Sequence, residues 1–351
     1  MKIVVDENIP LAEELFGAHA EVIRCVGRSI SQRELVDVQA LIVRSVTLVD
    51  RSLLSNTDIE FVGSCTAGFD HIDAEFMAKA GIDWNYAPGC NARSVAEYVS
   101  SVLAALDTLE PGKRAGIIGC GHVGRAVYDE LSNFGMEVVA YDPFLKGEEE
   151  PRTLTTLEDA MSSDIVCLHT PYTDDGPFPT AGMIGEAELN RLQTNAILIS
   201  AGRGGVLDEQ AMYSAAKARP DIRWVMDVWS GEPQINPASL ELASIATPHI
   251  AGYSLEGKQN GSWQVYQHFC EHFGFSPKQR KEAPGERSER DSASIGETLL
   301  GVYDPRSDDE RMRKAFIEAT KEERKIGSWF DSLRRDYPQR RECFTSNCIR
   351  P

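Results

Sequence analysis

The sequence lacks the features that would define several other classes of protein. No apolar run in its 351 residues approaches the ~20 residues that a membrane-spanning helix requires, so we expect no membrane protein. Its eight cysteines form no C-x-x-C pair and no metal-type cluster, so we expect no metal site and mostly buried, unpaired thiols. The first residues lack the cleavage pattern of a signal peptide and are typical of a strand. These absences together predict a cytoplasmic protein.

Positive charge is also scarce. The chain has 36 Lys and Arg against 54 Asp and Glu, a formal net charge of −18. The deficit lies in residues 1–277, with 19 basic and 39 acidic side chains, whereas residues 278–351 hold 17 and 15. Such an acidic body argues against nucleic acid or an anionic membrane as a partner. An anionic substrate must therefore be held by local arginines and backbone amides.

A glycine-rich turn within residues 114–142 carries the clearest functional signal. An apolar stretch leads into Gly119-Cys120-Gly121-His122-Val123-Gly124, followed by a helical pattern and a second apolar stretch that ends at Asp142. This arrangement lets a pyrophosphate approach backbone N–H groups at a helix N-terminus. Asp142 lies 18 residues beyond Gly124, where a carboxylate accepts hydrogen bonds from the adenosine ribose and repels a 2′-phosphate. The turn predicts NAD as the cofactor rather than NADP.

Short apolar segments alternate with helical patterns over the first 250 residues, which indicates an α/β fold with parallel sheets. Helical patterns at 94–109 and about 255–273 would connect two such units. A polar stretch at 278–297 is typical of a linker, and a charged, helix-prone tail follows it. The expected strands are 3–5, 40–43, 61–62, 115–118, 138–141, 165–168, 196–199, 224–228 and 244–246.

Three polar segments that follow successive expected strands contain Arg203, Glu232 and His249. The loops at the carboxyl ends of parallel strands line the ligand crevice, so we expect these side chains to converge. Together they suit the oxidation of a 2-hydroxy acid. His249 can take the hydroxyl proton, Glu232 can orient the imidazole, and Arg203 can hold the carboxylate and polarise the new carbonyl. Each residue alone also has a purely structural interpretation, and only their order and spacing favour catalysis.

These segments resemble the D-isomer-specific 2-hydroxyacid dehydrogenase family, whose active sites use an Arg, a Glu and a His in this order. The resemblance covers residues 1 to about 275. Further segments are similar to the members that oxidise 4-phospho-D-erythronate to (R)-3-hydroxy-2-oxo-4-phosphooxybutanoate in pyridoxal 5′-phosphate (vitamin B6) biosynthesis. The resemblance thus implies a phosphorylated sugar acid as substrate. The segments are 43–47, 63–73, 87–92, 247–257, 302–304 and 334–342.

The resemblance implies a role for individual residues. Arg203, Glu232 and His249 would be catalytic, with His249 as the proton donor or acceptor. Ser45, Thr66 and Tyr253 would contact the substrate, and Arg44 is a candidate for its phosphate. The residues implied to contact NAD are Gly119, Gly121, His122, Val123, Gly124, Asp142, Thr170, Ala201, Gly202, Arg203, Asp227 and Gly252.

The implied architecture is two Rossmann-like domains with parallel sheets flanking a cleft, plus a small C-terminal α+β dimerisation domain. Residues 1–93 with 256–277 would form a flavodoxin-like substrate-binding domain, and 94–255 the NAD-binding domain. Residues 278–297 would be the linker, and 298–351 the domain that makes a homodimer.

Two alternatives stay open. One is another D-2-hydroxyacid dehydrogenase, of the phosphoglycerate or hydroxypyruvate type. The other is a non-catalytic NAD-binding regulator, against which the intact Arg203, Glu232 and His249 argue, because a regulator needs none of them.

Overall fold

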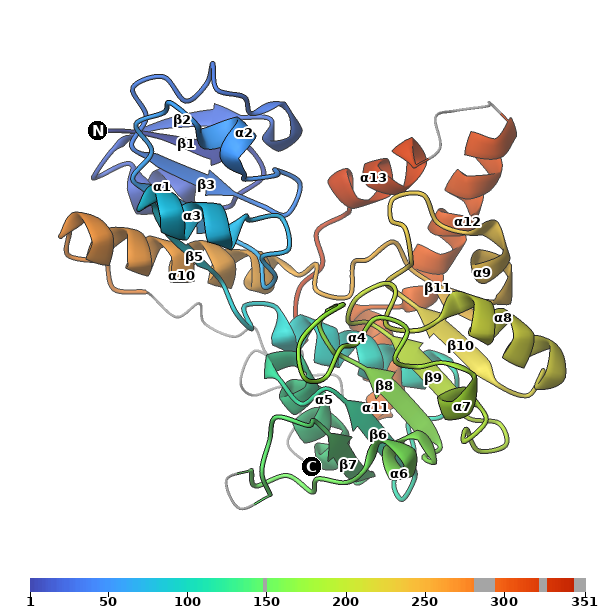
Figure 1. The fold of residues 1–351 in the computed structure, drawn as a ribbon. Helices are drawn as coiled ribbons and strands as arrows, with labels where there is room; N and C mark the ends of the chain where they lie inside the picture. Colours follow the sequence, from blue (N-terminus) through green and yellow to red (C-terminus); the bar gives the residue numbers. More distant parts are fainter. Residues whose placement is uncertain (148–149, 281–293, 322–326, 344–351) are drawn as a thin grey trace. The chain divides into compact units, whose positions relative to one another are not determined.

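The computed structural model describes residues 1–147, 150–280, 294–321 and 327–343 (Figure 1). The chain divides into two compact units, Met1–Asn91 with Ser254–Gly285 and Ala92–Tyr253 with Glu286–Pro351. Each unit contains one parallel sheet with helices, which confirms the expected α/β fold with two Rossmann-like domains. The functional division into a substrate-binding, an NAD-binding and a dimerisation domain stays a prediction.

The first unit contains a five-stranded parallel sheet with the order β2-β1-β3-β4-β5. Side chains alternate between the two faces of a strand, so Ile3 and Ile42 enter one core cluster whereas Val4 and Leu41 enter the other. In the central strands β1 and β3 both faces are buried, and their sequences are therefore almost continuously apolar. The strands are β1 (Lys2–Asp6), β2 (Glu21–Cys25), β3 (Ala40–Val43), β4 (Phe61–Ser64) and β5 (Asp83–Tyr86).

Strands β2 and β5 were not expected from the sequence. Both strands lie at the edges of the sheet, and most of their residues are only partly buried or exposed. Edge strands tolerate polar side chains such as Arg24 and Asn85, which interrupt the apolar pattern used to find strands.

Helix α10 (Leu255–Phe273) packs against β4 and β5 and coincides with the helix expected there. The hydroxyl of Ser254 accepts a hydrogen bond from the amide of Gly257 at 2.9 Å and caps its first turn. Gly274, with φ of 72°, ends the helix in the left-handed conformation that favours glycine. The other helices of this unit are α1 (Ala12–Phe16), the 3₁₀ helix η1 (Gly27–Ser29), α2 (Arg51–Leu54) and α3 (Ala74–Ala80).

The second unit contains a six-stranded parallel sheet with the order β11-β10-β9-β8-β6-β7 (Figure 1). The first strand of this sheet, β6, lies between β7 and β8, so the chain changes its winding direction there. Ligands of doubly wound sheets bind beside the carboxyl ends of the strands at such a point. The strands are β6 (Arg114–Ile118), β7 (Glu137–Tyr141), β8 (Ile165–Leu168), β9 (Ile197–Ser200), β10 (Arg223–Met226) and β11 (Ile245–Ala246).

Helices cover both faces of this sheet. Val99 of α4 and Val127 of α5 pack with Ile117 of β6 in one core cluster, and Met212 of α8 packs with Leu198 of β9 in the other. The helices before the C-terminal segment are α4 (Ala92–Ala105), α5 (His122–Asn133), α6 (Leu157–Met161), α7 (Glu186–Leu189), α8 (Glu209–Ala218) and α9 (Pro237–Leu242).

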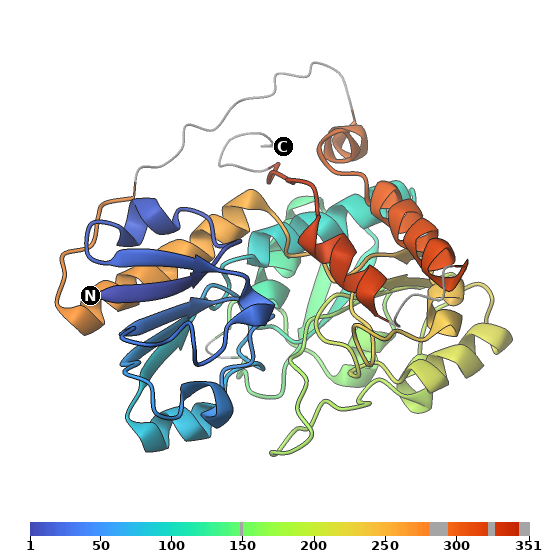
Figure 2. The same ribbon diagram turned by 90° about the horizontal axis from the view of Figure 1, so that it is seen from above.

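The C-terminal segment forms helices α11 (Ile295–Val302), α12 (Pro305–Lys321) and α13 (Ser328–Arg335). Helix α11 packs on α4, and α12 packs against β11 and α13 (Figure 2). Met312, Trp329 and Phe330 enter the core of the second unit. The described residues of 294–343 contain no strand, which corrects the expected α+β character, because their apolar side chains recur at helical spacing.

The expected linker is helical at its end. Ser294 and Glu297 form a capping box in which the Glu297 amide donates to the Ser294 hydroxyl at 3.2 Å and the Ser294 amide donates to the Glu297 carboxylate at 2.8 Å. Helix α11 therefore begins at Ile295, inside the stretch 278–297. Residues 281–293 of that stretch lie outside the described residues.

Candidate active site

Trp229 connects the two segments that carry the candidate catalytic acid and base. It follows β10 and is 1% exposed. Its backbone amide donates to Oε1 of Glu232 at 2.8 Å, and its indole Nε1 donates to the carbonyl of Thr247 at 2.9 Å. Because the Glu232 turn and the His249 loop are both bound to one buried residue, their relative position is fixed.

Glu232 and His249 form a hydrogen-bonded pair. Oε2 of Glu232 lies 2.8 Å from Nδ1 of His249, and the two side chains are 18% and 29% exposed. Burial raises the pKa of the Glu232 carboxyl, but His249, Arg334 and the Trp229 amide together leave it below its ordinary value. Glu232 is therefore ionised near neutral pH, and its carboxylate accepts a hydrogen bond from Nδ1 of the imidazole.

The second ring nitrogen of His249 is available for chemistry. No side chain or backbone group of the described residues bonds to Nε2, and the Nδ1 contact leaves a lone pair on it. His249 also has φ of 57°, a left-handed conformation that costs free energy in a residue with a Cβ. The bonds around its loop hold it there.

Asp227 fixes the backbone of that loop. Its Oδ1 accepts from the Thr247 hydroxyl at 2.6 Å and from the Ile250 amide at 2.8 Å, and its Oδ2 accepts from the Ala251 amide at 3.0 Å. Burial raises the pKa of Asp227 above its ordinary value, although these donors and His249 counteract it. The carboxylate expected to contact NAD thus also positions the His249 loop and Gly252, which follows Ala251.

Arg203 lies in the loop after β9, between the loops after β8 and β10. Its Nη1 donates to the carbonyl of Gly202 at 3.0 Å. A Cβ on Gly202 would lie 2.9 Å from the carbonyl oxygen of Thr170, and a Cβ on Gly204 would lie 1.9 Å from that of Trp229. Gly202 therefore allows the Arg203 loop to lie against the loop after β8, and Gly204 allows it to lie against the turn that carries Glu232.

The glycine turn after β6 has the geometry that a dinucleotide requires. Gly119 has φ of 89°, and a Cβ there would lie 2.8 Å from Cγ2 of Thr170. A Cβ on Gly124 would lie 1.9 Å from the carbonyl oxygen of Gly119, whereas Gly121 at the start of α5 faces open space. Helix α5 begins at His122, and Val123 lies in its first turn. A pyrophosphate can therefore reach the amides at this N-terminus.

Two side chains beside the turn complete the candidate NAD site. Oδ2 of Asp142 accepts from the Cys120 amide at 2.9 Å, and Oδ1 accepts from the Phe144 amide at 3.0 Å. The Thr170 hydroxyl is buried and has no hydrogen-bond partner among the described residues, so a bound nucleotide would supply one. Ala201 and Gly202 lie next to Thr170, as the close approach of their loop requires. These residues fit a dinucleotide.

His169 precedes Thr170 and is unsuited to act as the base. Burial lowers the pKa of its imidazole to about 4, so the ring is neutral near pH 7 and holds a proton only weakly.

Two of the three expected substrate contacts lie in the first unit, near the carboxyl ends of β3 and β4. Ser45 is exposed directly after Arg44, and Nη2 of Arg44 pairs with the buried Asp6 at 3.1 Å. The Thr66 hydroxyl lies 2.8 Å from the Ser64 hydroxyl, which lies 2.9 Å from Nε2 of His71. Tyr253, the third expected contact, lies in the second unit and donates its amide to the Ile250 carbonyl at 2.8 Å.

The described residues contain neither a metal-binding cluster nor a membrane-spanning helix. In residues 1–147, 150–280, 294–321 and 327–343, no three His, Cys, Asp or Glu side chains are placed to hold a metal ion. No helix in the same ranges is long and apolar enough to cross a bilayer. The seven cysteines described are all free, and five of them are buried.

Comparison with known proteins identifies the family. Residues 103–251 match the D-isomer specific 2-hydroxyacid dehydrogenase NAD-binding domain, and residues 279–349 match a domain of unknown function. The erythronate-4-phosphate dehydrogenase of Cellvibrio japonicus is 43% identical over 352 residues, which cover 97% of this chain and 93% of that protein. That of Teredinibacter turnerae is 41% identical with the same coverage. The chain belongs to the erythronate-4-phosphate dehydrogenase family. It is an NAD-dependent 2-hydroxyacid dehydrogenase.

Solved structures support the fold of this family member. The 3-phosphoglycerate dehydrogenase of Entamoeba histolytica is 23% identical with a TM-score of 0.64, covering 78% of this chain and 95% of that one. The D-lactate dehydrogenase of Aquifex aeolicus, complexed with NAD and lactic acid, is 23% identical with a TM-score of 0.63, covering 78% and 96%.

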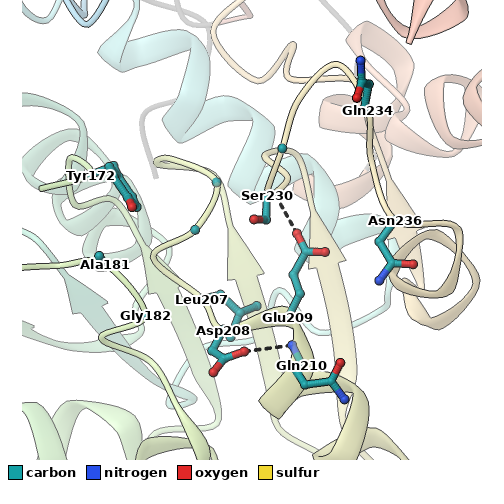
Figure 3. A pocket seen from close by; sticks show the side chains of 13 residues that line it. Tyr172, Ala181, Gly182, Leu207, Asp208, Glu209, Gln210, Ser230, Gln234 and Asn236 are labelled. Carbon is teal, nitrogen blue, oxygen red and sulfur yellow. Dashed lines mark hydrogen bonds between the residues drawn. The ribbon is translucent and has the colours of Figure 1, made fainter. Parts of the chain in front are cut away.

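A hollow of about 680 Å³ lies next to the turn that carries Glu232, and Figure 3 shows the side chains that line it. Gly204 and Ser230 line this hollow, whereas Arg203, Glu232 and His249 do not. It therefore lies next to the Glu232–His249 pair and does not enclose it. Glu209 lines the hollow, and its side-chain Oε1 accepts a hydrogen bond from the Ser230 amide at 2.6 Å. This bond supports the turn that presents Glu232.

Two arginines of the C-terminal segment, Arg334 and Arg340, contact this site but had no role assigned from the sequence. Nη2 of Arg340 donates to the carbonyls of Ala251 at 2.6 Å and Ser94 at 2.9 Å, and its guanidinium lies 4.4 Å from the Tyr303 ring centroid. Arg334 lies over the ring of Tyr253. Both arginines lie in a segment rich in charged residues. The spacing of residues along the chain does not distinguish an arginine that packs against the site from one that is solvated.

Proposed function

We propose that this chain oxidises 4-phospho-D-erythronate to (R)-3-hydroxy-2-oxo-4-phosphooxybutanoate, a step of pyridoxal 5′-phosphate biosynthesis. The observation that carries the proposal is the 2.8 Å pair between Glu232 and His249, in a chain 43% identical to a named erythronate-4-phosphate dehydrogenase. Oxidation at C2 removes a hydroxyl proton and a hydride. NAD, when bound, supplies the hydride acceptor.

His249 takes the proton in this proposal. Nε2 accepts a hydrogen bond from the C2 hydroxyl and then its proton, so the ring becomes an imidazolium. Oε2 of Glu232, already bonded to Nδ1, stabilises that positive charge. A hydrogen bond to a charged group contributes about 1.5–3 kcal/mol, and here it strengthens as the charge develops. In the reverse reaction the same nitrogen returns the proton.

Arg203 binds the substrate carboxylate and polarises the C2 oxygen. Its planar guanidinium forms two parallel bonds to a carboxylate, which orients C2 as well as holding the anion. The neighbouring glycines leave the backbone amides of the loop accessible for further bonds. Such local donors are necessary because the body of the protein carries an excess of negative charge.

A panel of 2-hydroxy acids tests the proposal. The purified protein is given NAD with 4-phospho-D-erythronate, 3-phosphoglycerate, glycerate or D-lactate, and NADH absorbance is followed. A 2-oxo acid is added in parallel to recycle the cofactor, because the oxidation is energetically uphill. We expect kcat/KM for 4-phospho-D-erythronate to exceed the others by about 100-fold or more. A higher kcat/KM for another acid would assign the chain to that substrate instead.

We further propose that the protein works in the cytoplasm as a homodimer joined through its C-terminal segment. The free cysteines suit a reducing compartment. Ile295, Val302 and Ile317 of α11 and α12 are 42%, 44% and 51% exposed, and such apolar side chains favour a protein interface. Light scattering should give the mass of two chains, and Ile317→Glu should reduce it toward one. A monomeric wild type would contradict this arrangement.

A further inference from the structure

Arg334 is a partly buried cation beside the candidate catalytic pair. It lies on α13 in the second unit, and its Cζ is 5.6 Å from the ring centroid of Tyr253. Tyr253 and Glu232 are the groups whose charges act on it most strongly. The side chain hydrogen-bonds Tyr253, but its Nε is buried with no hydrogen-bond partner among the described residues.

This situation is unfavourable without a ligand. A buried guanidinium N–H without an acceptor destabilises the protein. The neighbouring arginines have stronger partners, since Arg335 pairs with Asp336 at 2.9 Å and Nη2 of Arg340 donates to the Ser94 and Ala251 carbonyls. Burial lowers the pKa of Arg334, but Tyr253 and Glu232 outweigh it, so the side chain stays charged. An anion would supply the acceptor that the buried Nε–H of Arg334 lacks among the described residues.

The proposed substrate carries two anionic groups, a carboxylate next to C2 and a phosphate on C4. Arg203 is assigned to the carboxylate. We infer that Arg334 binds the phosphate group, so that the C-terminal segment selects phosphorylated 2-hydroxy acids. Arginine suits this role because its planar fork binds two phosphate oxygens at once. The inference rests on the proposed function and assigns a role to residues 279–349, which match a domain of unknown function.

Arg44, the earlier candidate for the phosphate, differs in its surroundings. Its Nε is likewise buried with no hydrogen-bond partner among the described residues, but its Nη2 pairs with the fully buried Asp6 at 3.1 Å, so part of its charge is already neutralised by the protein. Arg334 has no such carboxylate among the described residues and lies near Tyr253, an expected substrate contact. A phosphate should therefore bind more tightly to Arg334 than to Arg44, whose charge Asp6 already partly neutralises.

The decisive experiment compares 4-phospho-D-erythronate with unphosphorylated D-erythronate. Arg334→Gln should lower kcat/KM for the phosphorylated acid by about 100-fold or more, chiefly through KM, because two charge-assisted bonds are lost. It should change kcat/KM for D-erythronate by less than about 3-fold. Arg334→Lys keeps the charge and should lose only about 10-fold on the phosphorylated acid. The matched control is Arg335→Gln, on the next, exposed residue, which should match wild type on both acids.

An equal fall on both acids would overturn the inference, because Arg334 would then only support Glu232 and Tyr253. Unchanged kinetics would overturn it too. A wild type that oxidises another acid but not 4-phospho-D-erythronate would instead reject the proposed function.

Inorganic phosphate gives a second measurement where Arg334→Gln fails to fold or D-erythronate is turned over too slowly. It should inhibit the wild type competitively with 4-phospho-D-erythronate. Its inhibition constant should rise about 10-fold in Arg334→Lys. An identical constant in the two proteins would refute phosphate binding by Arg334.

Discussion

Glu130 provides a quantitative test of the electrostatics in the second unit. It lies on α5, which packs against α4, and its Oε1 is buried with no hydrogen-bond partner among the described residues. Burial and the nearby carboxylate of Glu97 raise its pKa from 4.5 to about 7, although Arg93 and Ser100 act in the opposite direction. The folded protein therefore holds this proton more tightly than the unfolded chain.

The sign and size of the effect follow from this pKa. The contribution of Glu130 to stability is fully present below about pH 4.5 and is lost as the pH rises through about 7. At about 1.4 kcal/mol per pH unit, the difference between these values corresponds to a loss of about 3 kcal/mol. Glu130→Gln has no such titration. It should be more stable than wild type by up to about 3 kcal/mol at about pH 8, and nearly equal to it at about pH 4.5.

Guanidinium denaturation followed by circular dichroism, repeated across this pH range, measures the difference. Glu318→Gln on α12 is the control, since Glu318 is exposed and should give a small, flat difference. A stability difference between Glu130→Gln and wild type that does not grow with pH would refute the reasoning. A variant less stable than wild type above pH 7 would refute it as well.

Three further variants test the candidate site. His249→Asn should lower kcat by about two to four orders of magnitude while NAD still quenches tryptophan fluorescence, because the base is lost and the glycine turn is intact; unchanged turnover would reject the assignment. Asp142→Asn keeps an acceptor for the Cys120 amide but removes the charge that repels a 2′-phosphate, so the NAD/NADP ratio of kcat/KM should fall about 10-fold or more, and a constant ratio would argue against this role. Glu209→Gln should lower kcat several-fold with little change in KM, because the Ser230 turn loses a charged acceptor; a rise in KM alone would show that Glu209 acts on binding instead.

Most strands of the two sheets were predictable from the sequence. Buried parallel strands such as 40–43 and 165–168 are continuous apolar runs, and the structure places β3 and β8 at those residues. The helix at 255–273 was predictable for a similar reason, because it has a cap at Ser254 and a terminating Gly274. The edge strands β2 and β5 were not predictable, and neither was the purely helical character of the described C-terminal residues. In both cases the elements packed against the segment, and not its local sequence pattern, determine the secondary structure.

The candidate site likewise has features that were predictable from the sequence and features that were not. The glycine turn and Asp142 were recognisable because a dinucleotide requires particular residues at short, fixed spacings. Arg203, Glu232 and His249 were recognisable because each follows a strand. The sequence does not contain the contacts between them.

By itself, the sequence determined the two parallel sheets, the nucleotide turn and the order of the catalytic candidates, since these depend on local periodicity and on backbone freedom at glycine. Only the tertiary structure decided that Trp229 joins the Glu232 and His249 loops at 2.8 and 2.9 Å. Only it placed Arg334 of α13 over Tyr253. Such contacts arise when elements distant in the chain pack together, and no spacing along the chain encodes which of them will meet.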